Sequence, residues 1–250
     1  FVKEIHDAGL FHRDLHGANL LVSGAPGTAE FHLVDLDDVT IGEELCYGKR
    51  LENLAMLGRF FCQVVPRHWR LRFLKAYAKD APTVALAAQT VEQMAVSGMR
   101  TVWAKTDRRI CGKNKYFYHA ALGRLTGHVR RTAEAKAAVA LFAEGDPFPR
   151  AEALLKDGRS STVGVFRLGD AAGGKRVVIK RRNPRRGWKR LLDPVRMSRA
   201  MRGFFAGAAF ENRCLPTPRV LATLDCRRFG RLGGDYLVLE YVDGAENLAK

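Results

Sequence analysis

An aspartate, an asparagine and a second aspartate stand near the amino end of this 250-residue chain at a spacing suited to phosphoryl transfer. Asn19 follows Asp14 by five residues, and Asp35 follows Asn19 by sixteen. Transfer of phosphate from ATP to an alcohol needs one carboxylate to accept the hydroxyl proton and further oxygen ligands that hold Mg²⁺ on the phosphates. We expect Asp14 to be the base, Asn19 and Asp35 to be catalytic Mg²⁺ ligands, and Asp37 to be a further metal ligand.

The residues that follow Asn19 predict a β-hairpin, which would position Asp14, Asn19 and Asp35. Two apolar runs, Leu20–Val22 and Phe31–Val34, flank the segment Ser23–Gly27, which contains glycine and proline. Short apolar runs separated by a turn sequence are typical of a β-hairpin, which would return the chain toward the loop that holds Asp14. The alternative is that this aspartate only caps a helix-to-strand turn.

The stretch Ile5–His16 resembles the catalytic region of bacterial lipopolysaccharide kinases of the Kdo/WaaP family, which are relatives of eukaryotic-type protein kinases. Asp35-Leu36-Asp37 departs from the Asp-Phe-Gly of protein kinases and is similar to the Asp-hydrophobe-Asp of the sugar-directed enzymes. The resemblance implies ATP-dependent transfer of phosphate to a hydroxyl of an inner-core sugar, heptose or Kdo, with ATP and Mg²⁺ as cofactors. It further implies a lipopolysaccharide precursor or another phosphorylated glycolipid as partner, and a cytoplasmic place at the inner face of the bacterial inner membrane.

A second set of candidate residues lies in the second half of the chain. The run Arg176–Lys180 ends in Val-Val-Ile-Lys, which resembles the kinase strand whose lysine holds the ATP phosphates, so the resemblance implies that role for Lys180. A glutamate in the following helix orients that lysine in kinases. Glu211 is the only local carboxylate once Asp193 is set aside as the cap of a helix over Pro194–Arg213. A solvent-exposed charge at the helix end is the alternative for Glu211.

Two further segments would complete a nucleotide site. A polar stretch stands where a phosphate-binding loop is expected, and it consists of Ser160, Ser161 and Thr162. Its hydroxyls and backbone amides could cap phosphates, although a plain polar hairpin is an equal alternative. The run Tyr236–Val242 resembles the strand and hinge on which adenine rests, and the resemblance implies adenine contacts to backbone groups from Glu240 to Val242.

The patterning predicts an α+β protein. Apolar residues recur at helical spacing over 48–65, 67–79 and 83–97, with Pro66 and Gly98 as the expected stops. The resemblance implies a protein-kinase-like fold, in which a helical catalytic lobe precedes a small antiparallel nucleotide-binding sheet with one helix. The expected division is a catalytic lobe at 1–105, a helical connector at 106–149 and a nucleotide lobe at 150–250. Within the connector, an alanine-rich helix is expected over 132–143, with Thr132 as its cap.

This order is reversed relative to a single kinase, in which the nucleotide lobe comes first. We favour the explanation that the chain spans the catalytic lobe of one kinase-like unit and the nucleotide lobe of a second, because both ends are abrupt. A circular permutant whose lobes close on each other is a second explanation. A pseudo-kinase lobe used only for binding is a third.

The net charge of +16 is concentrated in the second half of the chain. Residues 1–105 hold 12 Lys/Arg and 12 Asp/Glu, whereas residues 106–250 hold 30 and 14. The excess is densest over 175–202, and a field of this sign attracts polyanions. The alternative function is therefore a catalytically incomplete kinase-like module that binds anionic lipid or another polyanion through 175–202, with nucleic acid as the less expected partner.

The remaining composition excludes several classes of protein. The five cysteines lack the paired spacing of metal sites or of a disulfide framework, so reduced thiols are expected. No apolar run reaches 18 residues, so no membrane-spanning helix is expected. A hydrophobic fraction of 47% supports a buried core.

Overall fold

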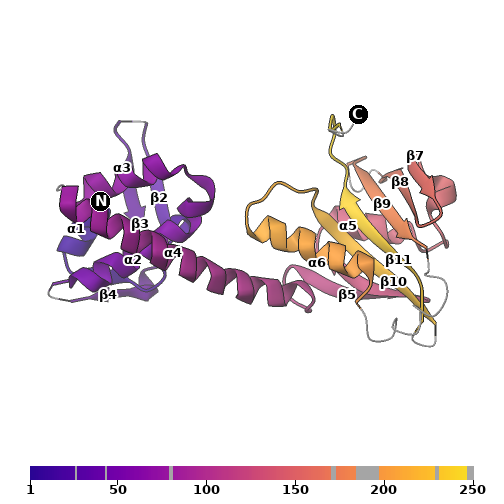
Figure 1. Cartoon of the computed structure of the whole chain (residues 1–250), viewed down its shortest axis with the longest axis horizontal. Coiled ribbons are helices and arrows are strands. Elements are labelled where there is room, and N and C mark those ends of the chain that lie inside the picture. The colour runs from indigo at the N-terminus through magenta and orange to yellow at the C-terminus, as the bar shows by residue number, and fades with distance from the viewer. Residues whose placement is uncertain are drawn as a thin grey trace. The chain divides into compact units, whose positions relative to one another are not determined.

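The computed structural model contains two compact units, unit 1 (Phe1–Ala104) and unit 2 (Lys105–Lys250) (Figure 1). It describes residues 1–25, 27–42, 44–78, 81–169, 173–183, 197–228 and 231–246. The division falls one residue from the boundary expected after residue 105, and one helix, α4 (Ala81–Ile110), runs through it. The mixture of helices and antiparallel sheets confirms the α+β class.

Unit 1 begins with short strands and continues with helices. Its elements are α1 (Val2–Asp7), β1 (Leu10–His12), β2 (Leu20–Ser23), β3 (Glu30–Leu33), β4 (Val39–Ile41), α2 (Tyr47–Val64), α3 (Arg67–Ala78) and the first part of α4. Strands β2 and β3 pair antiparallel, with Leu20 opposite Leu33, which confirms the predicted hairpin. Strand β1 pairs with β4. This pairing brings the chain that leads to Asp14 alongside the chain that follows Asp35.

Apolar spacing predicts α2 and α3 correctly and misses the length of α4. Pro66 separates α2 from α3 because proline lacks the N–H that a continuous helix would use there. The three helices share one core, to which they contribute Leu51, Leu54, Leu57, Leu74 and Val91. Helix α4 continues through Gly98, where the sequence predicted an end. This glycine has a packing role, since a Cβ there would lie 2.4 Å from Nε of Arg59.

Unit 2 is built on one antiparallel sheet. Its strands are β5 (Phe117–Leu122), β6 (Leu125–Arg130), β7 (Ala153–Gly158), β8 (Ser161–Arg167), β9 (Arg176–Arg182), β10 (Val220–Arg228) and β11 (Arg231–Glu240). Within the described ranges they follow one another across the sheet in the order β5-β6-β10-β11-β9-β8-β7. Helices α5 (Ala133–Ala140) and α6 (Arg199–Asn212) complete the unit.

The two helices of unit 2 pack on opposite faces of the sheet. Helix α5 contributes Ala135 and Val139 to a core that includes Val238 of β11. Helix α6 contributes Phe204 to a second core, which includes the neighbouring Leu237. Successive residues of a strand point to opposite faces, so these two neighbours identify an α5 face and an α6 face.

The predicted helical connector at 106–149 is wrong in its central part. This segment supplies β5 and β6, which join the edge of the sheet beside β10, and only α5 matches the expected helix. Thr132 caps α5 as predicted, because its side chain accepts a hydrogen bond from the Ala135 N–H. Gly127 explains how β6 fits, since a Cβ there would lie 1.8 Å from the carbonyl oxygen of Thr223 on β10.

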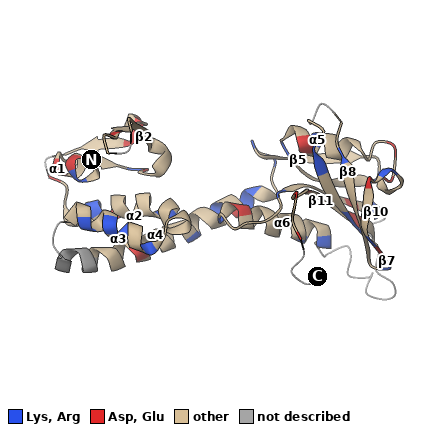
Figure 2. Cartoon of the chain, turned by 90° about the horizontal axis from the view of Figure 1, so that it is seen from above, with Lys and Arg blue, Asp and Glu red and all other residues tan. Residues whose placement is uncertain are grey.

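The predicted start of the last helix and the central part of the basic segment 175–202 lie outside the described residues. Asp193, Pro194 and the rest of 184–196 lie outside the described residues. Helix α6 begins at Arg199, where Ser198 caps it by accepting a hydrogen bond from the Met201 N–H. Figure 2 shows lysine and arginine positions on α3 and α4 as well as in unit 2. None of the described helices combines the length and apolar character that a membrane crossing requires.

Candidate functional site

A buried histidine anchors the loop that carries Asp14. His12 is 1% exposed, and both of its ring nitrogens are used. Its Nδ1 accepts a hydrogen bond from the Asp14 N–H at 3.1 Å, and its Nε2 donates to the Val34 carbonyl at 3.3 Å. This ring therefore ties the start of the loop to the end of β3, immediately before Asp35.

Asn19 forms a second bridge between the same two segments. Its side-chain Nδ2 donates to the Asp14 carbonyl at 3.0 Å, and its own carbonyl accepts from the Val34 N–H at 3.0 Å. Because Nδ2 is occupied, the amide orientation is fixed and Oδ1 stays available as an oxygen ligand. The fold thus brings Asp14, Asn19 and Asp35 together around Val34, as the predicted hairpin requires.

Asp35 adopts a backbone conformation that aspartate rarely takes. Its φ of 60° and ψ of 51° lie in the left-handed region, and it begins the short 3₁₀ turn Leu36–Asp38. Such conformations cost about 1–3 kcal/mol and cluster at functional sites. The Arg13 N–H donates to the Asp38 carbonyl at 2.8 Å, which holds this turn against the loop.

The carboxylates of this group face solvent. Asp14, Asp35 and Asp37 are all exposed, and the Asp14 carboxylate lies 3.6 Å from Nε2 of His16. Exposed carboxylates and an oriented amide are the hard oxygen donors that suit Mg²⁺. In the described ranges, no three His, Cys, Asp or Glu side chains are grouped so that they could hold a metal alone. A magnesium ion here would therefore also need oxygen from Asn19, water or a phosphate.

A buried asparagine of α2, which the sequence did not indicate as a site residue, holds the start of this loop by hydrogen bonds to its backbone. Asn53 of α2 is 0% exposed; its Oδ1 accepts from the His12 N–H at 3.1 Å and its Nδ2 donates to the His12 carbonyl at 2.7 Å. His6 donates to the same Oδ1 and accepts from the Tyr77 hydroxyl. Burial lowers the pKa of His6. The available signal was a polar residue among the apolar positions of a helix.

In unit 2, Lys180 lies on the α6 face of the sheet. It stands opposite Leu237 of β11, which packs under α6, and opposite Val163 of β8. Residues opposite each other in an antiparallel pair share a face. By the same register Arg182 and Lys156 lie on this face too.

The three cations form a positively charged patch, which we call the cationic face. Burial lowers the pKa of Lys180, and the charges of Arg182 and Lys156 lower it further. Within the part of the chain that is described, no carboxylate lies within ion-pair distance of any of the three, and the buried Asp235, opposite Arg182 on β11, is a carboxylate that interacts with this patch electrostatically. An anionic ligand would reduce this repulsion, so the geometry fits the phosphate-binding role expected for Lys180.

The expected phosphate loop is a tight hairpin turn between β7 and β8, and only part of it shares the face of Lys180. Ser161 stands opposite Arg182 and can share that face. Thr162 stands opposite Arg181 and points to the other side, where its hydroxyl bonds Asp157 and Arg181. The Thr162 hydroxyl therefore lies on the opposite face of the sheet from Lys180 and is not placed to cap a phosphate bound there. The Ser160 carbonyl accepts from the Asn183 N–H, which clamps the turn to β9.

The expected pairing of Glu211 with Lys180 is also wrong in this structure. Glu211 lies at the end of α6, and its carboxylate accepts from Arg130 of β6 at 2.5 Å. Arg219 lies 3.4 Å from its other oxygen. Glu211 therefore joins the last turn of α6 to β6, which is a structural role. At the first turn of the same helix, the Asp235 carboxylate accepts a hydrogen bond from the Arg199 N–H.

The hinge expected at Glu240–Val242 keeps only some of its backbone groups available. The Glu240 N–H donates to the Arg219 carbonyl at 2.9 Å, and the Tyr241 N–H donates to the Arg176 carbonyl at 3.3 Å. Val242 is exposed, and among the described residues its backbone N–H has no partner. An adenine contact in this segment would therefore fall to carbonyl groups and to the Val242 amide.

Comparisons with protein-family models, with curated proteins and with solved structures found no match for this chain.

Proposed function

We propose that this chain carries two parts of an ATP-dependent phosphotransferase: a catalytic group in unit 1 and a phosphate-binding face in unit 2. The observation that carries the proposal is a network of four hydrogen bonds, in which the buried His12 and Asn19 join the backbone of Asp14 to Val34, the residue immediately before Asp35. A turn that only caps a helix would not need a buried histidine and a buried asparagine to fix its backbone beside an aspartate in the left-handed conformation.

The roles follow from the chemistry of each group. The acceptor alcohol oxygen forms a bond to the γ-phosphorus of ATP, the bond to the ADP oxygen breaks, and the alcohol proton passes to the carboxylate of Asp14. Asn19 and Asp35 would hold Mg²⁺ through their side-chain oxygens, with Asp37 as a further ligand. The metal would neutralise the phosphate charge. Lys180, together with Lys156, Arg182 and Ser161, would bind the phosphates of a nucleotide on the cationic face.

We further propose a sugar hydroxyl of the lipopolysaccharide inner core, on heptose or Kdo, as the acceptor. The Asp35-Leu36-Asp37 tripeptide favours a glycolipid hydroxyl over a protein side chain as the acceptor, and the exposed carboxylates leave room for such a substrate. A lipopolysaccharide precursor or another phosphorylated glycolipid is anionic, as is the inner face of the inner membrane, and the positive charge of unit 2 favours both.

A second candidate function is favoured by the cationic face itself. Lys156, Lys180 and Arg182 could bind a phosphorylated or otherwise anionic ligand without any contribution from unit 1. In this alternative the chain is a binding module for anionic lipid or another polyanion, and it transfers no phosphate.

The first experiment measures transfer from radiolabelled ATP to deacylated lipopolysaccharide core in the presence of Mg²⁺. Asp14→Asn should reduce turnover by roughly 100-fold or more while circular dichroism stays unchanged, because an exposed base contributes to the reaction and little to the fold. Glu30→Gln, an exposed carboxylate on β3 outside the group, is the matched control and should keep full activity. Equal activity of Asp14→Asn and wild type would remove Asp14 from the mechanism.

The second experiment measures nucleotide binding by calorimetry. Lys180→Met should weaken Mg·ATP binding by roughly tenfold or more, because a charged hydrogen bond to phosphate is lost. Lys136→Met, which removes an exposed lysine from α5, and Glu211→Gln should leave affinity unchanged. Inorganic tripolyphosphate that binds as tightly as ATP, without any transfer, would favour the polyanion-binding alternative.

A further inference from the structure

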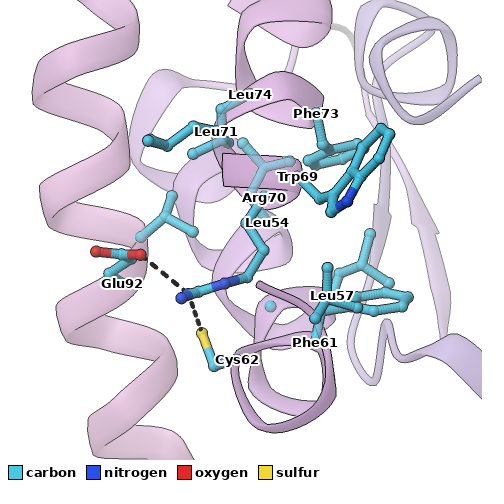
Figure 3. Close-up of a pocket in the computed structure, with 13 residues that line it drawn as sticks. Leu54, Leu57, Phe61, Cys62, Trp69, Arg70, Leu71, Phe73, Leu74 and Glu92 are labelled. Carbon is cyan, nitrogen blue, oxygen red and sulfur yellow. Dashed lines mark hydrogen bonds and ion pairs between the residues drawn. The ribbon is translucent and has the colours of Figure 1, made fainter. Parts of the chain in front are cut away.

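Helices α2, α3 and α4 enclose an apolar pocket in unit 1 that contains none of the residues proposed for phosphoryl transfer (Figure 3). Its volume is about 220 Å³. Its walls include Leu54, Leu57, Phe61, Trp69, Leu74 and Val91. An engineered apolar cavity of about 150 Å³ binds benzene, so this pocket has room for an apolar group somewhat larger than one benzene ring.

One edge of the pocket is formed by an ion pair between Arg70 and Glu92. Figure 3 shows the Arg70 guanidinium between Glu92 and Cys62. Its Nη1 lies 2.9 Å from the Glu92 carboxylate and 2.9 Å from the Cys62 sulfur. Arg67 contacts the same carboxylate at 3.3 Å. Two guanidinium groups thus share one carboxylate, and the second, Arg67, lies outside the pocket wall on the exposed surface, so the neighbourhood of this edge carries one positive charge more than negative.

The donors of Arg70 are also incompletely used. Its Nε is buried without a hydrogen-bond partner among the residues that the structure describes. A buried donor without a partner costs about 1–3 kcal/mol, so an added acceptor beside this guanidinium would be favourable.

We propose that this pocket binds a medium-chain monocarboxylate, with the alkyl chain among the leucine and aromatic side chains and the carboxylate against Arg70. The pocket volume of about 220 Å³ is less than one and a half times the roughly 150 Å³ of a cavity that binds the six carbons of benzene, so it fits one alkyl chain of about eight carbons. It is too small for a packed helix or for a second copy of the chain. The surplus positive charge selects an acid over an alcohol or amine of equal length. This inference is independent of the proposed phosphotransferase function.

The test titrates the full chain with octanoate, octanol and octylamine, and follows tryptophan fluorescence, to which Trp69 contributes from the pocket wall, together with saturation-transfer NMR of the ligand methyl group. Trp69 lines the pocket, so ligand entry should change its emission. Octanoate should bind more tightly than octanol, and octylamine should bind most weakly. Butanoate should bind more weakly than octanoate, because it leaves the far wall of the pocket uncovered.

Two variants separate the chain-binding part from the head-group part. Cys62→Phe, which fills the pocket, should abolish binding of octanoate and octanol alike. Arg70→Met should weaken octanoate binding by roughly tenfold and leave octanol binding unchanged, because it removes the cation and keeps an apolar side chain. Lys75→Met, an exposed lysine on the same helix, is the matched control and should not change either affinity. Thermal unfolding of each variant verifies that unit 1 stays folded.

The proposal is overturned if octanoate produces no change in either signal at millimolar concentration. It is also overturned if octanol and octanoate bind equally, or if octanoate binds the Cys62→Phe chain as well as it binds wild type. None of these results would alter the activity expected of Asp14, so the failure of this inference is distinguishable from the failure of the proposed function.

Discussion

The two units hold their candidate residues in different ways. In unit 1, side chains bond the backbone: His12, Asn19 and Asn53 place the loop and the hairpin end by hydrogen bonds to main-chain groups. In unit 2, strand register does this work, because Lys180 and Arg182 share a face through their positions along β9. A site built from side-chain hydrogen bonds should fail when one buried polar residue is lost. A site whose residues are aligned by strand pairing should be lost when a substitution keeps two neighbouring strands from pairing.

The largest effect is expected where the sheet of unit 2 is most crowded. Gly127→Ala would place a Cβ 1.8 Å from the Thr223 carbonyl oxygen, so β6 and β10 must separate. We expect a loss of about 3 kcal/mol or more in the free energy of unfolding, since backbone cannot give way as a flexible side chain can. Urea denaturation followed by far-UV circular dichroism measures it. Gly169→Ala, where a Cβ would meet nothing within 4 Å, is the control. Equal stability of the two variants would contradict the role of register.

The next effect tests unit 1. Asn53→Ala removes both hydrogen bonds to the His12 backbone and leaves a buried N–H and a buried carbonyl unpaired. The expected cost is about 2–3 kcal/mol, with a matching loss of phosphate transfer because the Asp14 loop is released. Glu52→Ala, a half-exposed neighbour on the same helix whose carboxylate pairs with Lys49 at the surface, should cost little. Full activity in the Asn53 variant would show that the loop does not depend on this support.

A smaller effect of opposite sign is expected in α2. Gly58→Ala would place a Cβ 3.5 Å from the Ala95 Cβ and 3.8 Å from Val91, which are ordinary contacts. Alanine should stabilise unit 1 by about 0.5–1 kcal/mol because glycine is a poor helix former. Gly98→Ala is the contrasting variant, since its Cβ would meet Arg59, and it should not stabilise. The Trp69 unfolding transition reports both, and a destabilised Gly58 variant would contradict the observed packing.

The smallest effect concerns acid sensitivity of unit 2. Burial lowers the pKa of His128; the nearby His119 lowers it further, and Asp225 opposes them. The folded state therefore binds the proton less tightly than the unfolded state, whose value is near 6.5. The stability of unit 2 should be complete above that pH and fall as pH drops below it. His128→Gln should flatten this decline when urea midpoints are compared by amide NMR of β6 at pH 7.5 and pH 5.5. An unchanged slope would exclude His128 as its source.

Local patterns predicted the elements whose signals are self-contained. The hairpin after Asn19, the α2 and α3 helices separated by Pro66, and the Thr132 cap of α5 each follow from a few adjacent residues. The grouping around Val34 followed as well, because a hairpin of known length returns the chain to its start.

Other predictions failed because the deciding partner is distant in sequence. Gly98 stops no helix, since Arg59 of α2 occupies the space that a side chain would need. Glu211 pairs with Arg130 from a segment expected to be a connector, so its partner could not be found near Lys180. Thr162 lies on the wrong face because strand alternation, which depends on the exact pairing with β9, decides its direction.

The sequence by itself determined which residue types stand close along the chain, and so the aspartates, the asparagine and the hairpin that returns them to one another. Only the tertiary structure decided that Asn53 lies beneath this loop, that Arg182 and Lys156 flank Lys180, and that an apolar pocket ends at Arg70. The physical reason is that short-range turns and periodicities act between adjacent residues. Burial, register and ion pairing depend on residues that meet only after the chain has packed.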